Sequence, residues 1–291
     1  MKWITVFLAS ALVRVMSPDF AFASNDQVDA SEWRMQLNVA GRQRMLTQQM
    51  TKAACMKILH INPVKRSEEA FIAAAEFEDN LDDLINGDTR RNLAPVQDPK
   101  SQAILREVVG TSPALTSSIK QLVSGDLHSF AMALVLERNV PLLEKAEETV
   151  SLIEAAAREG HTGPMVASTL NKAGRQRMLS QRIAKNLCLI SANLEAEKAR
   201  KDLVVASANF TQTMAGLRHG DPANGLLPPP TSDIEARLET VQGCWQRVQD
   251  SVMTVQTGGS VTPARLQEIV AELDLILEEM DAVLQLWVAH E

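Results

Sequence analysis

The sequence predicts an all-α protein built as two tandem up-down-up-down four-helix bundles related by internal duplication. The composition is rich in helix-favouring residues, and aromatic residues make up only 4% of the chain, which argues against strands. The second observation is a repeat: residues 37–52 and residues 170–185 align at an offset of 133 and share the heptapeptide Ala-Gly-Arg-Gln-Arg-Met-Leu. The length of the chain agrees with this prediction, because 291 residues are enough for two domains of ordinary size.

The repeat extends far beyond the heptapeptide. Without a gap, the same offset matches Cys55 with Cys188 and Phe77 with Phe210, and it continues through the Gly-Asp pairs at 87–88 and 220–221. One unit has therefore been duplicated. We expect the first copy to occupy residues 24–159 and the second copy residues 160–291.

Helix-breaking residues divide each unit into four helices. In the first copy we expect helices over residues 27–60 and 67–86, a loop over residues 92–99, a third helix from there to residue 124, and a fourth that ends near Arg158. The second copy has matching stops near residues 219–222, 227–230 and 258–259. In this topology each unit begins and ends at the same end of its bundle. The short linker at residues 159–164 then sets the second motif helix beside the first bundle, and Pro164 suits its first turn.

The N-terminus resembles a secretory signal peptide over residues 1–23. Lys2 supplies a positive charge, a short apolar stretch follows, and residues 21–23 give the small-x-small pattern of a cleavage site after Ala23. We therefore expect export to the periplasm. The formal net charge of −7 makes nucleic acid an unsuitable partner, so any anion must be attracted by a local basic cluster.

Each motif helix, meaning the helix that carries the heptapeptide, has two faces that avoid solvent. At 100° per residue, one apolar face suits the bundle core and one mixed stripe contains an arginine. The stripe positions are Leu37, Gly41, Arg44, Gln48 and Cys55 in the first copy, and Leu170, Gly174, Arg177, Gln181 and Cys188 in the second. A helix with a single partner surface does not need this second face.

Side-by-side packing of the two motif helices about a pseudo-twofold axis would bring equivalent stripe residues together. Gly41 and Gly174 would then let the backbones approach, and Arg44 and Arg177 would point into one shared space. Two guanidinium groups repel each other unless a small oxyanion lies between them, and their forked donors match such an anion. We expect the neutral donors around the rim to be Asn38, Asn171, Gln48 and Gln181.

A competing hypothesis is that each arginine pairs with Glu or Asp of a neighbouring helix. Arg42 and Arg175 lie off the stripe and are expected to be flanking or solvated charges. Equivalent stripe positions also make Cys55 and Cys188 a possible disulfide, although both could instead pack as small apolar residues. A third possibility pairs Cys244 with Cys188.

The run from Asn171 to Arg182, with its echo from Asn38 to Gln49, resembles the signature of PilJ-type sensory domains, which occur in type IV pilus chemotaxis transducers. It is also similar to the motif helix of nitrate/nitrite sensor kinases. The resemblance implies a four-helix bundle that binds nitrate between two motif helices. Carried over by position, the contacts come from Gly41, Arg44, Gly174 and Arg177. Lys172 and Arg182 match further basic positions of the sensor-kinase motif, where the first copy has Val39 and Gln49.

No motif for catalysis, haem or a phosphate-binding loop occurs, so we expect neither an enzyme nor a cofactor. The leading hypothesis is an exported sensory module that binds a small inorganic oxyanion, nitrate or nitrite, between the two motif helices. It would report to a separate membrane transducer or sensor kinase. Alternatives are a ligand-free helical adaptor that docks on a transmembrane transducer or type IV pilus component, and a binder of an organic anion. Whether the copies pair within one chain or between chains stays open.

Overall fold

The structure is a computed structural model that describes residues 30–125, 129–159 and 163–290. The expected signal peptide, its cleavage after Ala23 and the expected start of the first helix at Gln27 lie outside the described residues. The described residues contain eight α-helices and no β-strand, so the predicted all-α class is confirmed.

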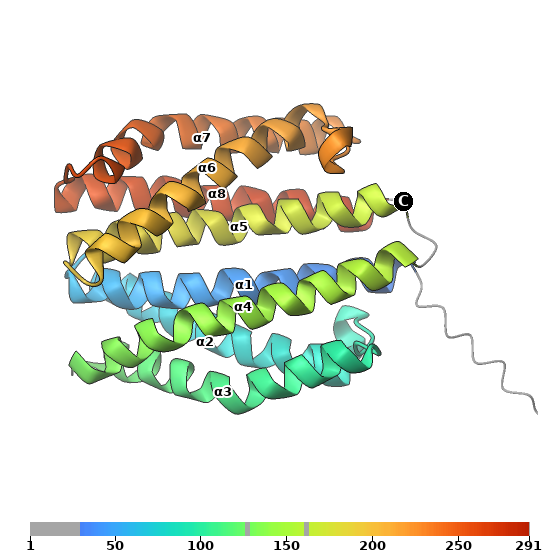
Figure 1. Cartoon of the computed structure of the whole chain (residues 1–291), viewed down its shortest axis with the longest axis horizontal. Helices are drawn as coiled ribbons and strands as arrows, with labels where there is room; N and C mark the ends of the chain where they lie inside the picture. The colour runs from blue at the N-terminus through green and yellow to red at the C-terminus, as the bar shows by residue number, and fades with distance from the viewer. Residues whose placement is uncertain (1–29, 126–128, 160–162, 291) are drawn as a thin grey trace, which may run out of the picture.

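The helices form two consecutive sets of four (Figure 1). The first set is α1 (Ala30–Ile58), α2 (Pro63–Asn86), α3 (Pro99–Ser124) and α4 (Ser129–Glu159). The second set is α5 (Pro164–Ser191), α6 (Ala196–His219), α7 (Ser232–Gln256) and α8 (Pro263–Ala289). A short 3₁₀ turn follows α2 at Thr89–Arg91 and another follows α6 at Pro222–Asn224. The fold is therefore two tandem four-helix bundles, as predicted.

The start of α2 differs from the sequence-based prediction. The helix begins at Pro63, four residues before the expected position at Ser67. Asn62 adopts a left-handed conformation with φ 49° and turns the chain, and a proline is favoured in the first turn of a helix because no intrahelical bond needs its missing N–H. Pro164 likewise stands in the first turn of α5, as expected. The predicted domain boundary, between residues 159 and 160, falls at the end of α4.

The duplication is visible in details of packing and turns. Phe77 of α2 and Phe210 of α6 are both fully buried in the core. The loop after α2 is closed by a bridge between Asp88 and Leu93, and the loop after α6 by the equivalent bridge between Asp221 and Leu226. Equivalent residues therefore have the same structural role in both copies.

The helices α1 and α5 lie side by side and parallel at the centre of the molecule, where they form the most extensive helix–helix contact (Figure 1). Each is flanked by two helices of its own bundle, α2 and α4 beside α1, and α6 and α8 beside α5. This arrangement buries two faces of each motif helix, as the sequence predicted. It also places the charged stripe between the bundles, where few charges are normally found.

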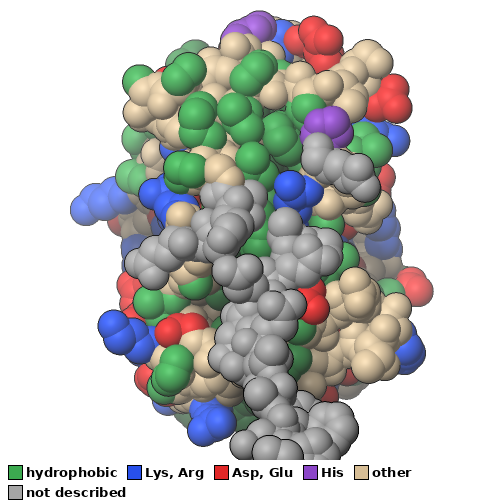
Figure 2. Space-filling view, turned by 90° about the vertical axis from the view of Figure 1, so that its right-hand side faces the viewer, with side chains coloured by type: hydrophobic (Ala, Val, Ile, Leu, Met, Phe, Trp, Pro, Cys, Tyr) green, Lys and Arg blue, Asp and Glu red, His purple; other side chains and the backbone are tan. Residues whose placement is uncertain are grey.

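Figure 2 shows the end of the molecule at which α1 begins and α8 ends. Charged side chains of both signs lie around its rim, and hydrophobic side chains gather over the half formed by α5–α8. The opposite ends of the motif helices are joined, because a disulfide links Cys55 of α1 to Cys188 of α5 with a Cα–Cα distance of 6.1 Å. Cys244 is a free, buried cysteine, so the alternative pairing of Cys244 with Cys188 was wrong.

Candidate functional site

The guanidinium groups of Arg44 on α1 and Arg177 on α5 converge in the interface between the bundles. The two arginines are 0% and 1% exposed, respectively. Their Nη2 atoms lie over both motif glycines: an ideal Cβ on Gly41 would lie 3.3 Å from Arg44 Nη2 and 3.5 Å from Arg177 Nη2, and one on Gly174 would lie 3.4 Å and 3.6 Å from the same atoms. The two copies therefore contribute to one shared site.

The role of the glycines differs from the sequence-based expectation. We expected Gly41 and Gly174 to let the two helix backbones approach each other. The two atoms nearest to each ideal Cβ position are the Nη2 atoms of Arg44 and Arg177, and neither is a backbone atom of the facing helix. The missing side chains thus make room for the arginines rather than for the helix backbones.

Each arginine crosses the pseudo-twofold axis to the asparagine of the other motif helix. Arg44 Nη1 donates to Asn171 Oδ1 at 2.8 Å, and its Nη2 donates to the Asn171 carbonyl at 3.3 Å. Arg177 Nη2 donates to the Asn38 carbonyl at 3.2 Å. Both asparagines therefore act as acceptors for the arginines, and the side-chain amide of Asn171 also donates, to Glu154 at 2.5 Å.

The Nη1 atoms of both arginines also donate to carboxylates from the last helix of each bundle. Arg44 Nη1 donates to Glu147 of α4 at 2.9 Å, and Arg177 Nη1 donates to Asp281 of α8 at 2.5 Å. The competing hypothesis, in which each arginine pairs with an acid of a neighbouring helix, therefore describes these two contacts. By contrast, the Nε atoms of both arginines and Asn38 Oδ1 are buried without a hydrogen-bond partner.

Arg42 and Arg175 also take part in this cluster. Arg42 pairs with Asp281 at 2.5 Å and with Glu76, and Arg175 pairs with Glu147 at 2.9 Å. The side chains of Arg42 and Arg175 are 26% and 49% exposed, so Arg42 is a half-buried charge that flanks the arginine pair and Arg175 is partly solvated. Their ion pairs were not foreseen because the helical wheel places them off the stripe.

Four arginines surround this site and pair with three carboxylates, Glu76, Glu147 and Asp281. A fourth carboxylate, Glu154, accepts from Asn171 Nδ2 at 2.5 Å and attracts Arg44. Burial lowers the pKa of Arg177 to about 10, with Asp281 opposing the shift and Arg42 and Arg44 adding to it. Burial also lowers the pKa of Arg44, although Glu147 opposes it. Both guanidinium groups are therefore cationic at neutral pH, and each is paired with one carboxylate.

The carboxylates of Glu147 and Asp281 stay ionised because the neighbouring arginines favour their charged forms. Burial disfavours the charged form of Glu147, but attraction by Arg44 and Arg175 outweighs burial and lowers its pKa. For Asp281 burial is likewise outweighed by Arg177 and Arg42.

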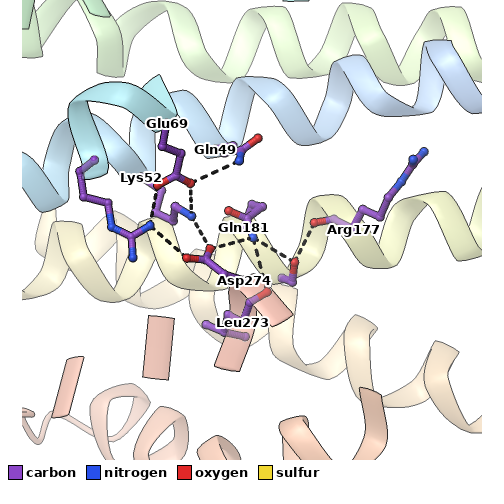
Figure 3. Close-up of polar contacts among 9 residues, drawn as sticks. Gln49, Lys52, Glu69, Arg177, Gln181, Leu273 and Asp274 are labelled. Carbon is purple, nitrogen blue, oxygen red and sulfur yellow. Dashed lines mark hydrogen bonds and ion pairs between the residues drawn. The ribbon is translucent and has the colours of Figure 1, made fainter. Parts of the chain in front are cut away.

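The other predicted site residues lie away from the arginine pair. Gln48 and Gln181 are fully buried one turn further along their helices, where Gln48 Nε2 donates to Asn139 at 3.2 Å and Gln181 Nε2 approaches Asp274 at 3.5 Å (Figure 3). They are not at a rim. Lys172 donates to the carbonyl of Asn224, and Arg182 pairs with Asp202. Lys172 lies five residues before Arg177 and Arg182 five residues after it, so each is rotated by about 140° from Arg177 around the helix and points elsewhere.

Two parallel motif helices, each embedded in its own four-helix bundle and joined through a buried charged centre, define a duplicated helical domain. The chain matches the family PilJ, described as the type IV pili methyl-accepting chemotaxis transducer N-terminal domain, over residues 32–126 and 165–269. It belongs to that family, and the two matched segments confirm the two tandem copies. No curated protein and no solved structure matches the chain.

Two further properties concern the described part of the chain. None of its helices combines the length and the apolar character needed to cross a membrane. Within the same residues, no group of three or more His, Cys, Asp or Glu side chains is arranged to hold a metal ion.

Proposed function

We propose that the protein is an exported sensory module that binds one small oxyanion, nitrate or nitrite, between α1 and α5. The observation that carries this proposal is the convergence of the Arg44 and Arg177 guanidinium groups over Gly41 and Gly174. One arginine paired with one acid is an ordinary structural contact. Two arginines from equivalent positions, brought together over two glycines, form a site with matching halves.

The hydrogen bonds of the arginines leave the appropriate donors free. In each guanidinium group Nη1 holds the carboxylate, Nη2 makes one bond to a backbone carbonyl, and Nε has no partner. The Nε–Nη2 edge, which can hold an oxyanion through two parallel bonds, is therefore largely unused. An anion bound by both edges would lie between the two buried guanidinium groups and offset their mutual repulsion.

The contacts between the arginines and the carboxylates suggest how anion binding would change the packing of the helices. Glu147 lies on α4 and Asp281 on α8, the last helices of the two bundles. An anion bound on the Nε–Nη2 edges would offset part of the positive charge that attracts these carboxylates, weaken the hold of α1 on α4 and of α5 on α8, and so shift the packing of the bundles. A separate membrane transducer or sensor kinase would receive this change.

Export to the periplasm is part of the proposal. The Cys55–Cys188 disulfide supports it, because disulfides persist in oxidising compartments and are rare in the cytosol. The signal-peptide pattern at residues 1–23 points the same way.

Thermal unfolding with nitrate, nitrite, chloride and sulfate tests the proposal. A ligand at about 100 times its Kd stabilises by roughly 2.7 kcal/mol, which raises the midpoint by several degrees. Arg44→Lys and Arg177→Lys keep the charge but lose the forked donors, so each is expected to abolish the nitrate shift. Arg247→Lys is the matched control, because Arg247 makes a forked pair with Glu272 on the exposed surface, away from the site.

If none of the four anions moves the midpoint of the unmodified protein, the oxyanion proposal fails. The ligand-free adaptor that docks on a transmembrane transducer or pilus component is then the better hypothesis.

A further inference from the structure

A second pocket lies between α4, α5 and α6, about two helical turns along α5 from Arg177. Its volume is about 180 Å³. Its walls include the apolar side chains of Leu143, Leu189 and Ala199. Its polar lining consists of the buried Asn139, Lys185 and Asn186 and of the charged Arg182, Glu195, Lys198 and Asp202. Val140 and Lys198, which are exposed, lie at its mouth. We call this space the Lys185 pocket.

The ammonium group of Lys185 is incompletely paired. Lys185 is 5% exposed, and Nζ makes one hydrogen bond, to Asn139 Oδ1 at 3.1 Å. The nearby carboxylate of Asp202 is held by Arg182 and by Asn186 Nδ2, the latter at 2.7 Å. Among the described residues Lys185 makes no ion pair within 4 Å. An ammonium group has three donors, and a buried charge without an opposite charge is costly.

The equivalent lysine of the first copy is fully paired (Figure 3). Lys52 is buried and makes ion pairs at 2.5 Å with both Glu69 and Asp274. Arg66, also buried, pairs with the same two carboxylates. This cluster holds two cations and two anions, and its charges balance.

Two replacements separate the second copy from the first. Asn139 takes the place that Asp274 has in the first cluster. Asn139 Oδ1 accepts from Lys185 and Gln48, and Asp274 Oδ1 accepts from Lys52 and Gln181. Each therefore accepts from the lysine of the other copy and from the stripe glutamine of its own copy. A carboxylate is therefore missing. In addition, Arg66 aligns with Ala199 at the repeat offset of 133, so a large side chain is missing from the same place. Relative to the first cluster, the Lys185 pocket lacks one carboxylate and one guanidinium group, and the small side chain of Ala199 leaves space beside Lys185.

We propose that the Lys185 pocket binds a small organic monocarboxylate. The carboxylate accepts hydrogen bonds from the Lys185 ammonium group, in the place of the missing acid. The short apolar chain lies against Leu143 and Leu189. This site is separate from the arginine pair, and the apolar walls distinguish its ligand from an inorganic oxyanion.

The protonation of Lys185 gives the site a pH dependence. Burial lowers the pKa of Lys185 to about 8. The charged groups that act on it are Asp202 and Glu195, which raise its pKa, and Arg182 and Lys198, which lower it. Lys185 is therefore mostly cationic at pH 7, and carboxylate binding is expected to weaken as the pH rises above about 8.

Calorimetric titration of the full chain with butyrate tests this proposal, with butyramide as the uncharged analogue of the same size. We expect butyrate to bind and butyramide to bind at least about tenfold more weakly. Lys185→Met removes the charge and keeps an apolar side chain of similar length. Asn139→Asp gives Lys185 the acid that Asp274 gives Lys52. Both substitutions are expected to weaken butyrate binding at least about tenfold.

Two controls separate this site from other effects. Lys120→Met removes a lysine from the surface of α3 and is expected to leave butyrate binding unchanged. Gly41→Ala, at the arginine pair, is also expected to leave it unchanged, which makes the two proposals independent. The proposal is overturned if butyrate does not bind, if butyramide binds equally well, or if Asn139→Asp binds butyrate like the unmodified chain. If the Lys185→Met protein does not fold, the butyrate affinity of the Asn139→Asp protein still tests the proposal.

Discussion

Replacing Gly41 and Gly174 by alanine adds one methyl group to each motif helix where the two guanidinium groups meet. The added Cβ atoms would lie 3.3–3.6 Å from the Nη2 atoms of Arg44 and Arg177. These are ends of flexible side chains, so the guanidinium groups need to move by only a few tenths of an ångström. An anion oxygen bonded to Nη2 on this side would have to share the same space, because hydrogen-bonded atoms lie about 2.9 Å apart.

The expected effects on stability and on binding therefore have opposite signs. Alanine is favoured over glycine inside a helix by about 0.8–1.0 kcal/mol at each position, which offsets the small rearrangement of the arginines. We expect the unliganded Gly41→Ala/Gly174→Ala protein to unfold at the same temperature as the unmodified protein or above it. Nitrate affinity is expected to fall at least tenfold, a loss of about 1.4 kcal/mol.

Thermal unfolding without ligand and calorimetric titration with nitrate measure the two effects separately. Gly110→Ala on α3 is the matched control, because a Cβ at Gly110 meets nothing within 4 Å. It gains the same helix preference and leaves the site unchanged. The reasoning is refuted if the double variant keeps the nitrate affinity of the unmodified chain, or if Gly110→Ala lowers that affinity equally.

Reduction of the Cys55–Cys188 disulfide opens a loop of 133 residues and is expected to lower the unfolding free energy by about 2–5 kcal/mol, measured as a fall in the thermal midpoint on adding a thiol reductant; an unchanged midpoint with the bond reduced would contradict this. Acid is expected to destabilise the protein, because Glu147 and Asp281 have lowered pKa values when folded. Their contribution is complete above the pKa values of the unfolded chain and is lost as the pH falls through the folded values. Chemical unfolding at a series of pH values below about 5 measures it, and the loss should be smaller in Glu147→Gln, which lacks one of these groups.

Much of the fold could be predicted from the sequence because the internal repeat shows the duplicated unit and the periodicity of apolar residues shows which helix faces are buried. The repeat offset fixed the two copies, and the helical wheel identified the two buried faces of α1 and α5. It also selected Arg44 and Arg177 as the residues that converge. Helix ends were less well determined: the start of α2 at Pro63 depends on a single left-handed residue, Asn62.

The partners of the arginines could not be found in the same way. Glu147 and Asp281 act equivalently in the structure, yet they do not align at the repeat offset, since the residue that aligns with Asp281 is Glu148. Comparison of the two copies therefore gave no signal for the acids. The roles of the glycines and of Asn38 and Asn171 also depend on the direction of long arginine side chains, which residue spacing does not specify.

The central claim is that duplication places two half-sites for one anion on a single chain. Calorimetric titration of the monodisperse protein with nitrate, combined with its mass in solution, measures this directly. We predict one nitrate per chain, bound with the chain as a monomer, and no binding when either Arg44 or Arg177 is replaced by lysine. Two nitrate ions per chain, one per two chains, or full binding after one arginine is replaced would contradict it.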